Sequence, residues 1–183
     1  LAQPDAATIT VTDVGLPTAT PVTGCTQVTA FSVSCPAAGL TSIEVLLGAG
    51  EDELFVRSAS LPLTAWGGDG GDLFDDAEVG TGARIFNGEA GDDYMRSSIT
   101  PTLAHDYVGG DGFDSVDYNY RGPAASHTIT LDGIANDGAP GENDNVRADI
   151  ERIVGSEAGD TITGTDGTQW ILSMEGLDTV DAG

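Results

Sequence analysis

The sequence contains no lysine, and its six basic residues are all arginine. Against them stand 30 acidic residues, which give a formal charge of -24 at pH 7. A surface this acidic repels phosphate groups, so we expect neither nucleic acid nor an anionic membrane surface among its partners. The chain also lacks an apolar run near the ~18 residues that a membrane-spanning helix needs, so we expect no membrane span.

Cysteine is almost as scarce, with Cys25 and Cys35 as the two copies. Two cysteines without a neighbouring histidine are too few ligands for zinc, and they do not have the CxxC spacing of redox proteins. We expect a disulfide that closes the short segment 25–35, with two buried free thiols as the alternative. A disulfide implies an oxidising environment, so we expect a secreted or cell-surface protein.

Glycine, in contrast, is abundant at 26 of 183 residues, and much of it lies in a nonapeptide that recurs seven times. Each copy has a loop of small residues, a sixth residue that is acidic in six copies and Gln169 in the other, and an apolar eighth residue. The copies are 47–55, 67–75, 87–95, 109–117, 155–163, 164–172 and 173–181. Their eighth residues are Leu54, Phe74, Tyr94, Val116, Ile162, Ile171 and Val180, which we expect to face a core.

The spacing of these copies predicts a coiled β architecture. Each nonapeptide reads as a six-residue turn followed by a short strand, so two tandem copies make one full coil. The upstream copies recur every 20 to 22 residues, which is also one full coil, so the acidic turns return to the same edge each time. We expect an all-β parallel solenoid over 47–183, with an irregular coil at about 129–154, tandem nonapeptides at 155–181 and the acidic turns along one edge. Residues 1–46 should form a β cap that carries the disulfide.

The turns predict a cation site. Glycine allows positive φ and turns carbonyl oxygens inward, and carboxylates of adjacent coils would face one another. Such a cage of hard oxygen ligands suits several Ca²⁺ ions better than Mg²⁺ or transition metals. The predicted metal-site residues are Gly48, Gly50, Asp52, Gly67, Gly68, Asp69, Gly70, Asp72, Asn87, Gly88, Glu89, Asp92, Gly109, Gly110, Asp111, Gly112, Asp114, Gly155, Asp160 and Asp178. Departures such as Leu47, Ala90 and Met174 should weaken individual sites.

The nonapeptides resemble the hemolysin-type (repeats-in-toxin) calcium-binding repeat G-G-x-G-x-D-x-U-x of secreted bacterial proteins. The match is most specific in GGDGGDLFD (67–75) and GGDGFDSVD (109–117). The resemblance implies a right-handed parallel β-roll with calcium held in the turns. It also implies that the carboxylate ligands are Asp52, Asp72, Asp92, Asp114, Asp160 and Asp178, with backbone ligands from the first, second and fourth turn residues.

For two segments, the sequence allows more than one interpretation. The stretch 134–145 is either a distorted coil with its own ion, held by Asp132, Asp137 or Asp144, or a solvated loop. The residues around His105 and His127 are the one concentration of side chains that a polysaccharide-active β-helix enzyme would use, although exposed turns explain them without catalysis.

The sequence therefore predicts a secreted calcium-binding structural or adhesive protein that is not an enzyme. Its folding and rigidity would depend on extracellular calcium, and head-to-tail assembly into a homopolymer or contact with a cell surface or extracellular matrix is open to it. The alternatives are a calcium-dependent accessory domain of a larger secreted enzyme or toxin, and the polysaccharide-active enzyme.

Overall fold

The computed structural model describes residues 41–58, 61–76, 81–97, 103–120 and 125–183, together with three strands nearer the N-terminus. Those strands are β1 (Thr8–Asp13), β2 (Thr26–Thr29) and β3 (Ser32–Ser34). Cys25 and Cys35, on which the expected disulfide depends, lie outside the described residues.

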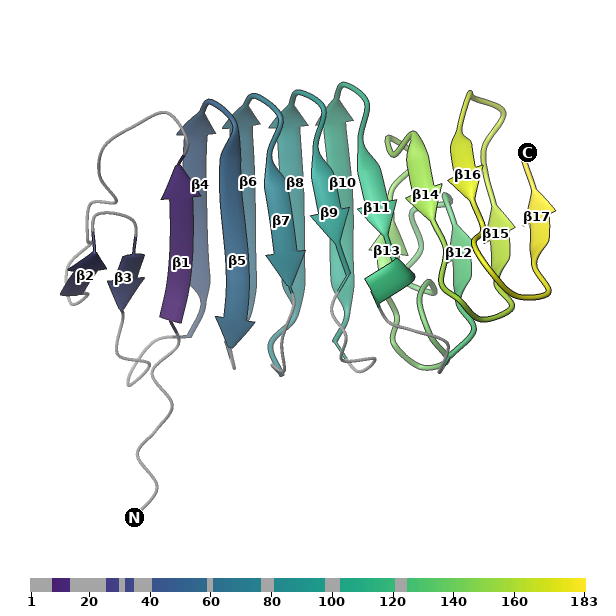
Figure 1. Ribbon diagram of the computed structural model, residues 1–183, viewed down its shortest axis with the longest axis horizontal. Helices are drawn as coiled ribbons and strands as arrows, with labels where there is room; N and C mark the ends of the chain where they lie inside the picture. Colours follow the sequence, from purple (N-terminus) through teal and green to yellow (C-terminus); the bar gives the residue numbers. More distant parts are fainter. Residues whose placement is uncertain are drawn as a thin grey trace, which may run out of the picture.

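The described chain is an all-β solenoid of about six turns, as the sequence predicts. Its rear sheet in Figure 1 contains β4 (Ile43–Ala49), β6 (Leu63–Asp69), β8 (Arg84–Ala90), β10 (His105–Asp111) and β13 (Asn145–Val146). Its front sheet contains β5 (Asp52–Ser58), β7 (Leu73–Asp76), β9 (Tyr94–Arg96), β11 (Ser115–Asp117), β14 (Arg152–Val154) and β16 (Trp170–Leu172). A third sheet contains β12 (Thr128–Thr130), β15 (Thr161–Thr163) and β17 (Thr179–Asp181). All neighbouring strands among these three groups pair in parallel.

The chain rises along the rear sheet, crosses the upper edge and descends along the front sheet in Figure 1, so the coils are right-handed. At the N-terminal end, β1 pairs antiparallel with β5, and β3 and β2 extend the front sheet further. The part of the chain that the structure describes has no helix of the length and hydropathy that a membrane crossing requires.

Alternation along each strand fills the core with one side chain per strand and coil. Leu54, Phe74, Met95 and Val116 stack from the front sheet and are fully buried, and Phe86 packs against Phe74 with ring centroids 5.3 Å apart. The predicted inward residues are confirmed for Leu54, Phe74, Val116 and Ile162.

Two expected core residues behave differently. Tyr94 pairs with Leu73 on the outer face, and its neighbour Met95 enters the core instead. Val180, in the last strand of its sheet, is 48% exposed, because no further coil covers it among the described residues.

The prediction that all acidic turns share one edge is wrong. The turns that end at Asp52, Asp72 and Asp114 lie on the upper edge, where the chain passes from the rear to the front sheet (Figure 1). Turns 155–160 and 173–178 instead follow β14 and β16 and lie on the lower edge, while 164–169 takes the upper edge. Within the tandem block, the expected alternation of edges is therefore confirmed.

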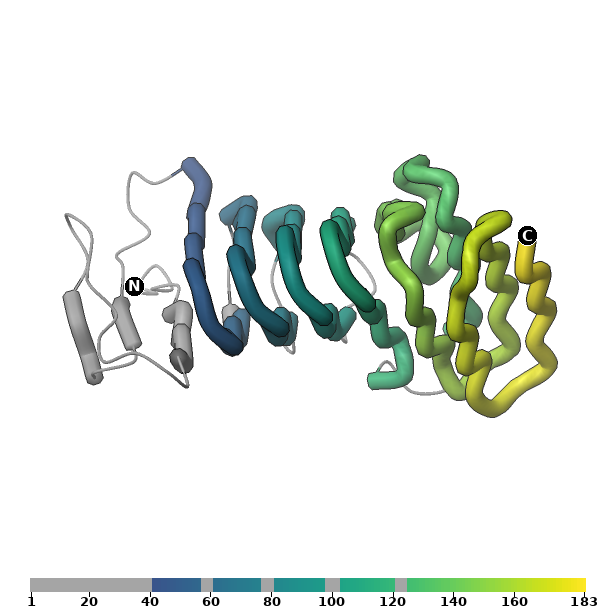
Figure 2. Tube along the Cα trace, turned by 90° about the horizontal axis from the view of Figure 1, so that it is seen from above, coloured from purple at the N-terminus to yellow at the C-terminus, as the bar shows by residue number. Residues whose placement is uncertain are grey.

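The cause is the segment between Asp114 and Asp160, which makes one and a half coils instead of two. After β12, residues 131–144 form an excursion that folds back, with antiparallel bridges joining Thr128 to Gly138 and Asp137 to Asp144. Only then does β13 pair with β10 and resume the coil. The excursion projects from the side of the stack in Figure 2, coloured green.

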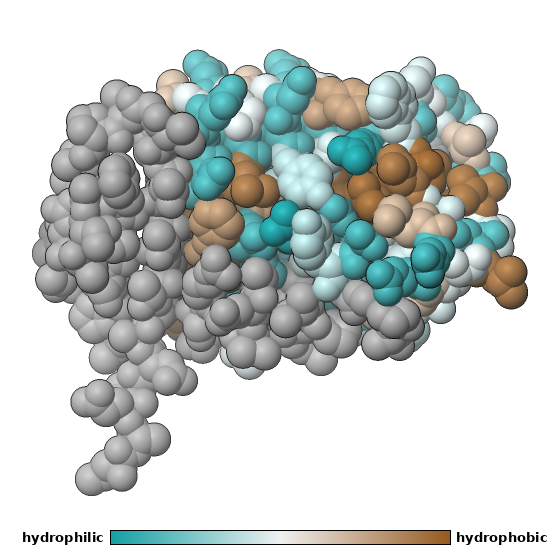
Figure 3. Space-filling view, viewed as in Figure 1, coloured by the Kyte–Doolittle hydropathy of each residue, from teal (hydrophilic) through white to brown (hydrophobic). Residues whose placement is uncertain are grey.

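The outer face of the front sheet carries one row of side chains across the strands. From the N-terminal side the register runs through Phe55, Asp75, Arg96, Asp117, Val154 and Leu172. Arg96 forms a 2.7 Å ion pair with Asp75 and lies 3.9 Å from the Tyr120 ring centroid. Figure 3 accordingly shows a polar centre between apolar ends on this face.

Candidate metal centre

The sixth residues of four successive upper-edge turns form a carboxylate row, which consists of Asp52, Asp72, Asp93 and Asp114. Each is at most 2% exposed, and each turn places its Asp just before, or at the start of, a front-sheet strand. One carboxylate oxygen of each of the last three accepts a backbone N–H from the preceding coil, at 2.7 to 2.9 Å. The N–H of Asp114 is in turn accepted by Glu151 at 2.8 Å. The row therefore holds each coil to the next.

The second carboxylate oxygen of the row has a different environment. Oδ2 of Asp72, Asp93 and Asp114 is buried in each case and has no hydrogen-bond partner. Burying a charged oxygen without a partner costs several kcal/mol in principle, so such oxygens normally face a cation or hold a proton. Three of them in consecutive coils form a repeated feature of the fold.

The pKa values of the row reflect this burial. Burial raises the pKa of Asp93 to about 7, because it outweighs the hydrogen bond from the Asp72 N–H, which lowers the pKa. The negative charges of Asp114 and Asp72 raise it further. Burial likewise raises the pKa of Asp72 to about 6, and that of Asp114 to about 6 with help from the charges of Glu151 and Asp149. These carboxylates therefore hold a proton more tightly than ordinary aspartates do.

The unpartnered oxygen of each turn lies against the glycine at the first position of that turn, and so does a carbonyl oxygen of the next coil. A methyl group added to Gly67 would overlap Asp72 Oδ2 and lie 2.6 Å from the carbonyl oxygen of Gly88. One added to Gly88 would overlap Asp93 Oδ2 and lie 2.6 Å from the carbonyl oxygen of Gly109. A carboxylate oxygen of one coil and a carbonyl oxygen of the next thus lie close together at each of these glycines, where no side chain would fit.

The glycines at the fourth position let the turns stack this closely. Gly50, Gly70, Gly91 and Gly112 all have φ between +127° and +145°, a conformation that side chains rarely adopt. A methyl group on Gly70 would overlap the carbonyl oxygen of Gly50. From the second turn onward, the turns can therefore lie in contact only if this position is glycine.

The prediction that Asp92 belongs to the row is wrong, because the repeat begins one residue later than expected. Trp66 pairs with Asn87 and Gly68 with Glu89, so Gly88 lies beside Gly67 and opens the turn. Asp93 is then the sixth residue, and Asp92 is exposed, where it accepts the N–H of Phe113 at 2.9 Å. Asn87 accordingly lies on the strand before the turn.

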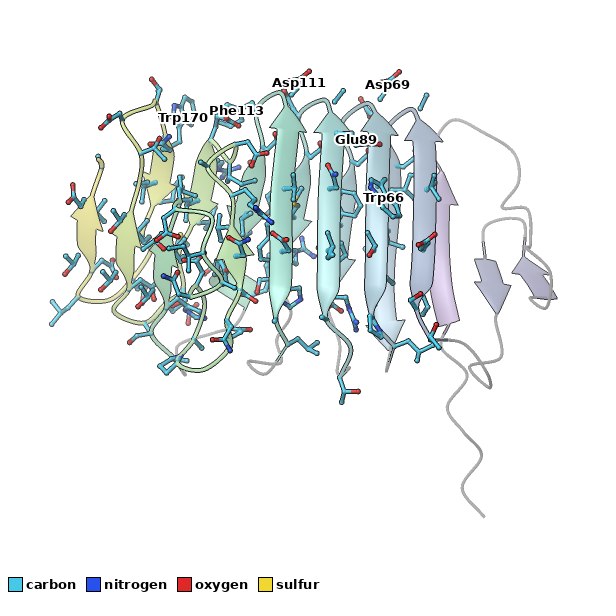
Figure 4. All side chains as sticks on the ribbon, turned by 180° about the vertical axis from the view of Figure 1, so that it is seen from behind. Trp66, Asp69, Glu89, Asp111, Phe113 and Trp170 are labelled. Carbon is cyan, nitrogen blue, oxygen red and sulfur yellow. The ribbon has the colours of Figure 1, made fainter. Side chains whose placement is uncertain are left out.

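The remaining upper-edge residues that the sequence predicted form the rim of the turns. Asp69, Glu89 and Asp111 are exposed along this edge (Figure 4). Gly48, Gly68 and Gly110 have φ of +111°, +106° and +110° at the second position, where Glu89 has φ of +72°. In the first turn, Leu47 takes the place of the first glycine, and Gly48 and Gly50 have open space where a side chain would stand. A pocket of about 350 Å³, lined in part by Asp52, Asp72 and Arg96, opens the N-terminal part of the row to solvent.

The lower-edge pair is built differently. Asp160 is 1% exposed, and both of its carboxylate oxygens accept hydrogen bonds, from the N–H groups of His127 and Ser156 and from the Ser156 hydroxyl. Asp178 accepts the Asp160 N–H at 2.9 Å. A methyl group on Gly155 would lie 2.7 Å from Asp160 Oδ2 and 2.8 Å from the Ser173 carbonyl oxygen. The two oxygens thus converge on the first-position glycine as in the upper turns, but this carboxylate already has hydrogen-bond partners.

Sequence reasoning singled out His105 but missed the buried polar cluster around it. His105, Glu142 and Asp144 could offer ligand atoms within 4.8 Å of one another. However, His105 Nδ1 lies 3.1 Å from both Asp144 Oδ1 and the Leu103 carbonyl oxygen, and Nε2 lies 3.1 Å from Asp76 Oδ2. Both ring nitrogens therefore face oxygen acceptors and donate, which leaves no lone pair for an ion.

The cluster is an ion-pair network. Its two carboxylates outweigh burial and raise the pKa of His105 to about 9, so the ring is charged at neutral pH. Arg84 donates to the same Asp76 oxygen at 3.1 Å, and Tyr118 donates to Asp144 at 3.0 Å. Because His105 and His127 are 2% and 1% exposed, neither offers its ring to a substrate at the surface.

For the segment 134–145, which the sequence left either as a distorted coil with an ion or as a solvated loop, the structure shows the hydrogen bonds of two of the three candidate ligands. Asp137 is buried and accepts hydrogen bonds from Thr130 and Val146, whose N–H groups lie 2.6 and 2.7 Å away. Asp132 is exposed, and its carboxylate accepts the N–H of Ile134. Asp137 therefore holds the excursion against the coil through its own hydrogen bonds.

Comparison of the chain with protein-family models, with curated proteins and with solved structures finds no match. The resemblance to the hemolysin-type repeat thus rests on the nonapeptides themselves, and the functional argument rests on the geometry of the turns.

Proposed function

We propose that the protein is a calcium-binding structural β-solenoid whose upper-edge turns hold Ca²⁺ between successive coils. The observation that supports this most is the set of buried, unpartnered Oδ2 atoms of Asp72, Asp93 and Asp114. Each lies against the first-position glycine of its turn, and for Asp72 and Asp93 a carbonyl oxygen of the next nonapeptide turn lies against the same glycine. Carboxylate and carbonyl oxygens are the ligands that Ca²⁺ prefers.

The charge of the whole chain supports the same proposal. With 30 acidic and 6 basic residues, the solenoid carries strong self-repulsion, which bound divalent cations would relieve. Extracellular calcium modules bind with dissociation constants of about 10⁻⁴–10⁻³ M. The protein would therefore become rigid outside the cell, as a secreted or surface-attached element of the hemolysin-type repeat class.

The test compares the adjacent variants Asp93→Asn and Asp92→Asn. In chelator, we expect Asp93→Asn to raise the free energy of unfolding by about 1–2 kcal/mol, since it removes a buried unpaired charge and keeps the acceptor for the Asp72 N–H. With calcium, we expect the order to reverse, because the variant has lost a charged ligand. Thermal melts followed by circular dichroism in both conditions measure the two differences.

Asp92→Asn is the matched control, because it removes the same charge one residue away from an exposed side chain that also accepts a backbone N–H. It should change neither melt by more than about 0.5 kcal/mol. If Asp93→Asn lowers stability equally with and without calcium, the carboxylate acts as a structural acceptor alone and the proposal fails.

A further inference from the structure

The upper-edge row continues into a coil that has no nonapeptide. Glu151, just before β14, accepts the Asp114 N–H at 2.8 Å, which is the contact that Asp114 makes with the Asp93 N–H one coil earlier. Residues 147–151 thus occupy the place of a turn, although their sequence RADIE has no glycine. Glu151 thus takes the place of the sixth-residue aspartate of a nonapeptide turn, with a side chain that is one carbon longer.

Asp149 brings its oxygens close to Asp114. A methyl group on Gly109 would lie 2.5 Å from Asp114 Oδ2 and 2.5 Å from the Asp149 carbonyl oxygen. The Asp149 carboxylate approaches the same turn, because its Oδ2 accepts the Gly110 N–H at 3.2 Å. Its other oxygen, Oδ1, is buried without a hydrogen-bond partner.

The site does not rest on the clustering of acids alone. Asp114 is fully buried, and its unpartnered Oδ2 lies against Gly109, as does the Asp149 carbonyl oxygen. Three carboxylates converge here, and the nearest cation among the described residues that acts on them is Arg147, which feels the charge of Asp149 but forms its ion pair with Asp106 at 2.7 Å. Two buried oxygens, one on Asp114 and one on Asp149, have no hydrogen-bond donor.

We propose that Asp114, Asp149 and Glu151 form a further site for a hard cation of the Ca²⁺ class, between the fourth turn and the irregular coil. This inference rests on the proposed function, because Asp114 also belongs to the carboxylate row. It adds two ligand residues outside every repeat and makes 147–151 the end of the row on the upper edge.

Trp170 provides a local reporter for this site. Its backbone N–H donates to the Glu151 carbonyl oxygen at 2.7 Å. Its ring packs against the ring of Phe113, the residue before Asp114, with centroids 5.6 Å apart. Figure 4 shows Phe113 and Trp170 together near the upper edge, away from Trp66. The chain has two tryptophans, so Trp66→Phe leaves Trp170 and Trp170→Phe leaves Trp66 as the sole tryptophan.

The experiment measures Tb³⁺ luminescence excited through tryptophan in these two backgrounds, with Ca²⁺ as competitor. In the Trp66→Phe background, we expect a Tb³⁺ signal that Ca²⁺ displaces. Adding Asp149→Asn and Glu151→Gln, which keep the hydrogen-bond acceptors, should lower the apparent Tb³⁺ affinity by about tenfold or more, since ligand charge sets affinity in such sites. The Trp66 signal of the Trp170→Phe background should not change.

Asp166→Asn is the control, because it removes one exposed charge from the neighbouring turn 164–169. Far-UV circular dichroism confirms that each variant is folded, and Asp149→Asn alone replaces the double variant if the latter is not. A Trp170 signal that survives both substitutions would overturn this inference. So would a signal through Trp66 alone, which would leave the proposed function standing, whereas silence through both tryptophans would overturn the two together.

Discussion

Single residues of the carboxylate row have two oxygens with separate roles. In Asp93, Oδ1 accepts the Asp72 N–H at 2.7 Å and ties two coils together, while Oδ2 is buried without a partner. A structural acceptor alone would not need the charge, since asparagine accepts the same bond. The carboxylate therefore matters for what its second oxygen holds, a proton or a cation.

If the second oxygen holds a proton when no metal is bound, the free energy of unfolding must depend on pH. The folded-state pKa values of Asp72, Asp93 and Asp114, about 6, about 7 and about 6, lie above the ordinary 3.8. The folded state thus binds more protons than the unfolded chain between about pH 4 and 7, so stability falls as pH rises through that window. Thermal melts in chelator across the window measure it.

Calcium should reverse this trend, because the ion binds the deprotonated carboxylates and its contribution grows as they ionise. The triple variant with asparagine at all three positions should lose most of the dependence on pH and serves as the control. Metal-free wild-type stability that rises from pH 4 to 7 would contradict the account of the row.

At the scale of elements, each upper-edge turn depends on backbone conformations that glycine supplies. At Gly70, φ is +127° and an added methyl group would overlap the Gly50 carbonyl oxygen. At Glu89, φ is +72°, a left-handed conformation that a side chain adopts at some cost. These positions let strain and steric overlap be tested in separate variants.

We expect Gly70→Ala to lower the free energy of unfolding by roughly 2–4 kcal/mol, from strain and overlap together. Gly133→Ala, where φ is +73° and the space is open, should lose only about 1 kcal/mol from strain. Glu89→Gly should gain roughly 0.5–1 kcal/mol, since it removes the strain of the left-handed residue. Chemical denaturation measures all three, and equal losses at Gly70 and Gly133 would contradict the close stacking of the turns.

How much of these elements the sequence predicts depends on the motif at each place. The period of 20 to 22 residues predicted the parallel coils and the upper-edge turns, because stacked coils need equal lengths of chain. The frame of 87–95 was ambiguous, since two consecutive aspartates allow either to be sixth. The frame that starts at Gly88 puts glycine at positions one and four and Met95 at eight, so the signal was present in the sequence.

Other features had no periodic signal to reveal them. The excursion 131–144 bends back through two isolated bridges, and only this backbone path turns 46 residues into one and a half coils. The partners of His105 lie 29 and 39 residues away in sequence, at Asp76 and Asp144, on segments that no repeat relates. Asp149 and Glu151 join the row through tertiary position alone.

At the scale of the whole molecule, the repulsion that comes with a net charge of -24 opposes folding. The core is one side chain deep per strand, with Leu54, Phe74, Met95 and Val116 in a single stack. At tenfold excess over the dissociation constant, each independent ion adds roughly 1.4 kcal/mol, so three sites add about 4 kcal/mol. That is a large share of the ~5–15 kcal/mol that stabilises a typical domain, so calcium should decide whether the solenoid is folded.

The most direct measurement is far-UV circular dichroism during a calcium titration, from excess chelator to about 10 mM Ca²⁺, tenfold above the weakest binding of extracellular calcium modules. The same titration with Mg²⁺ is the control, because that ion demands tighter octahedral geometry and retains its waters. We predict a cooperative gain of β signal with calcium alone. A full β signal in chelator that calcium leaves unchanged, in amplitude and in melting temperature, would contradict calcium-coupled folding.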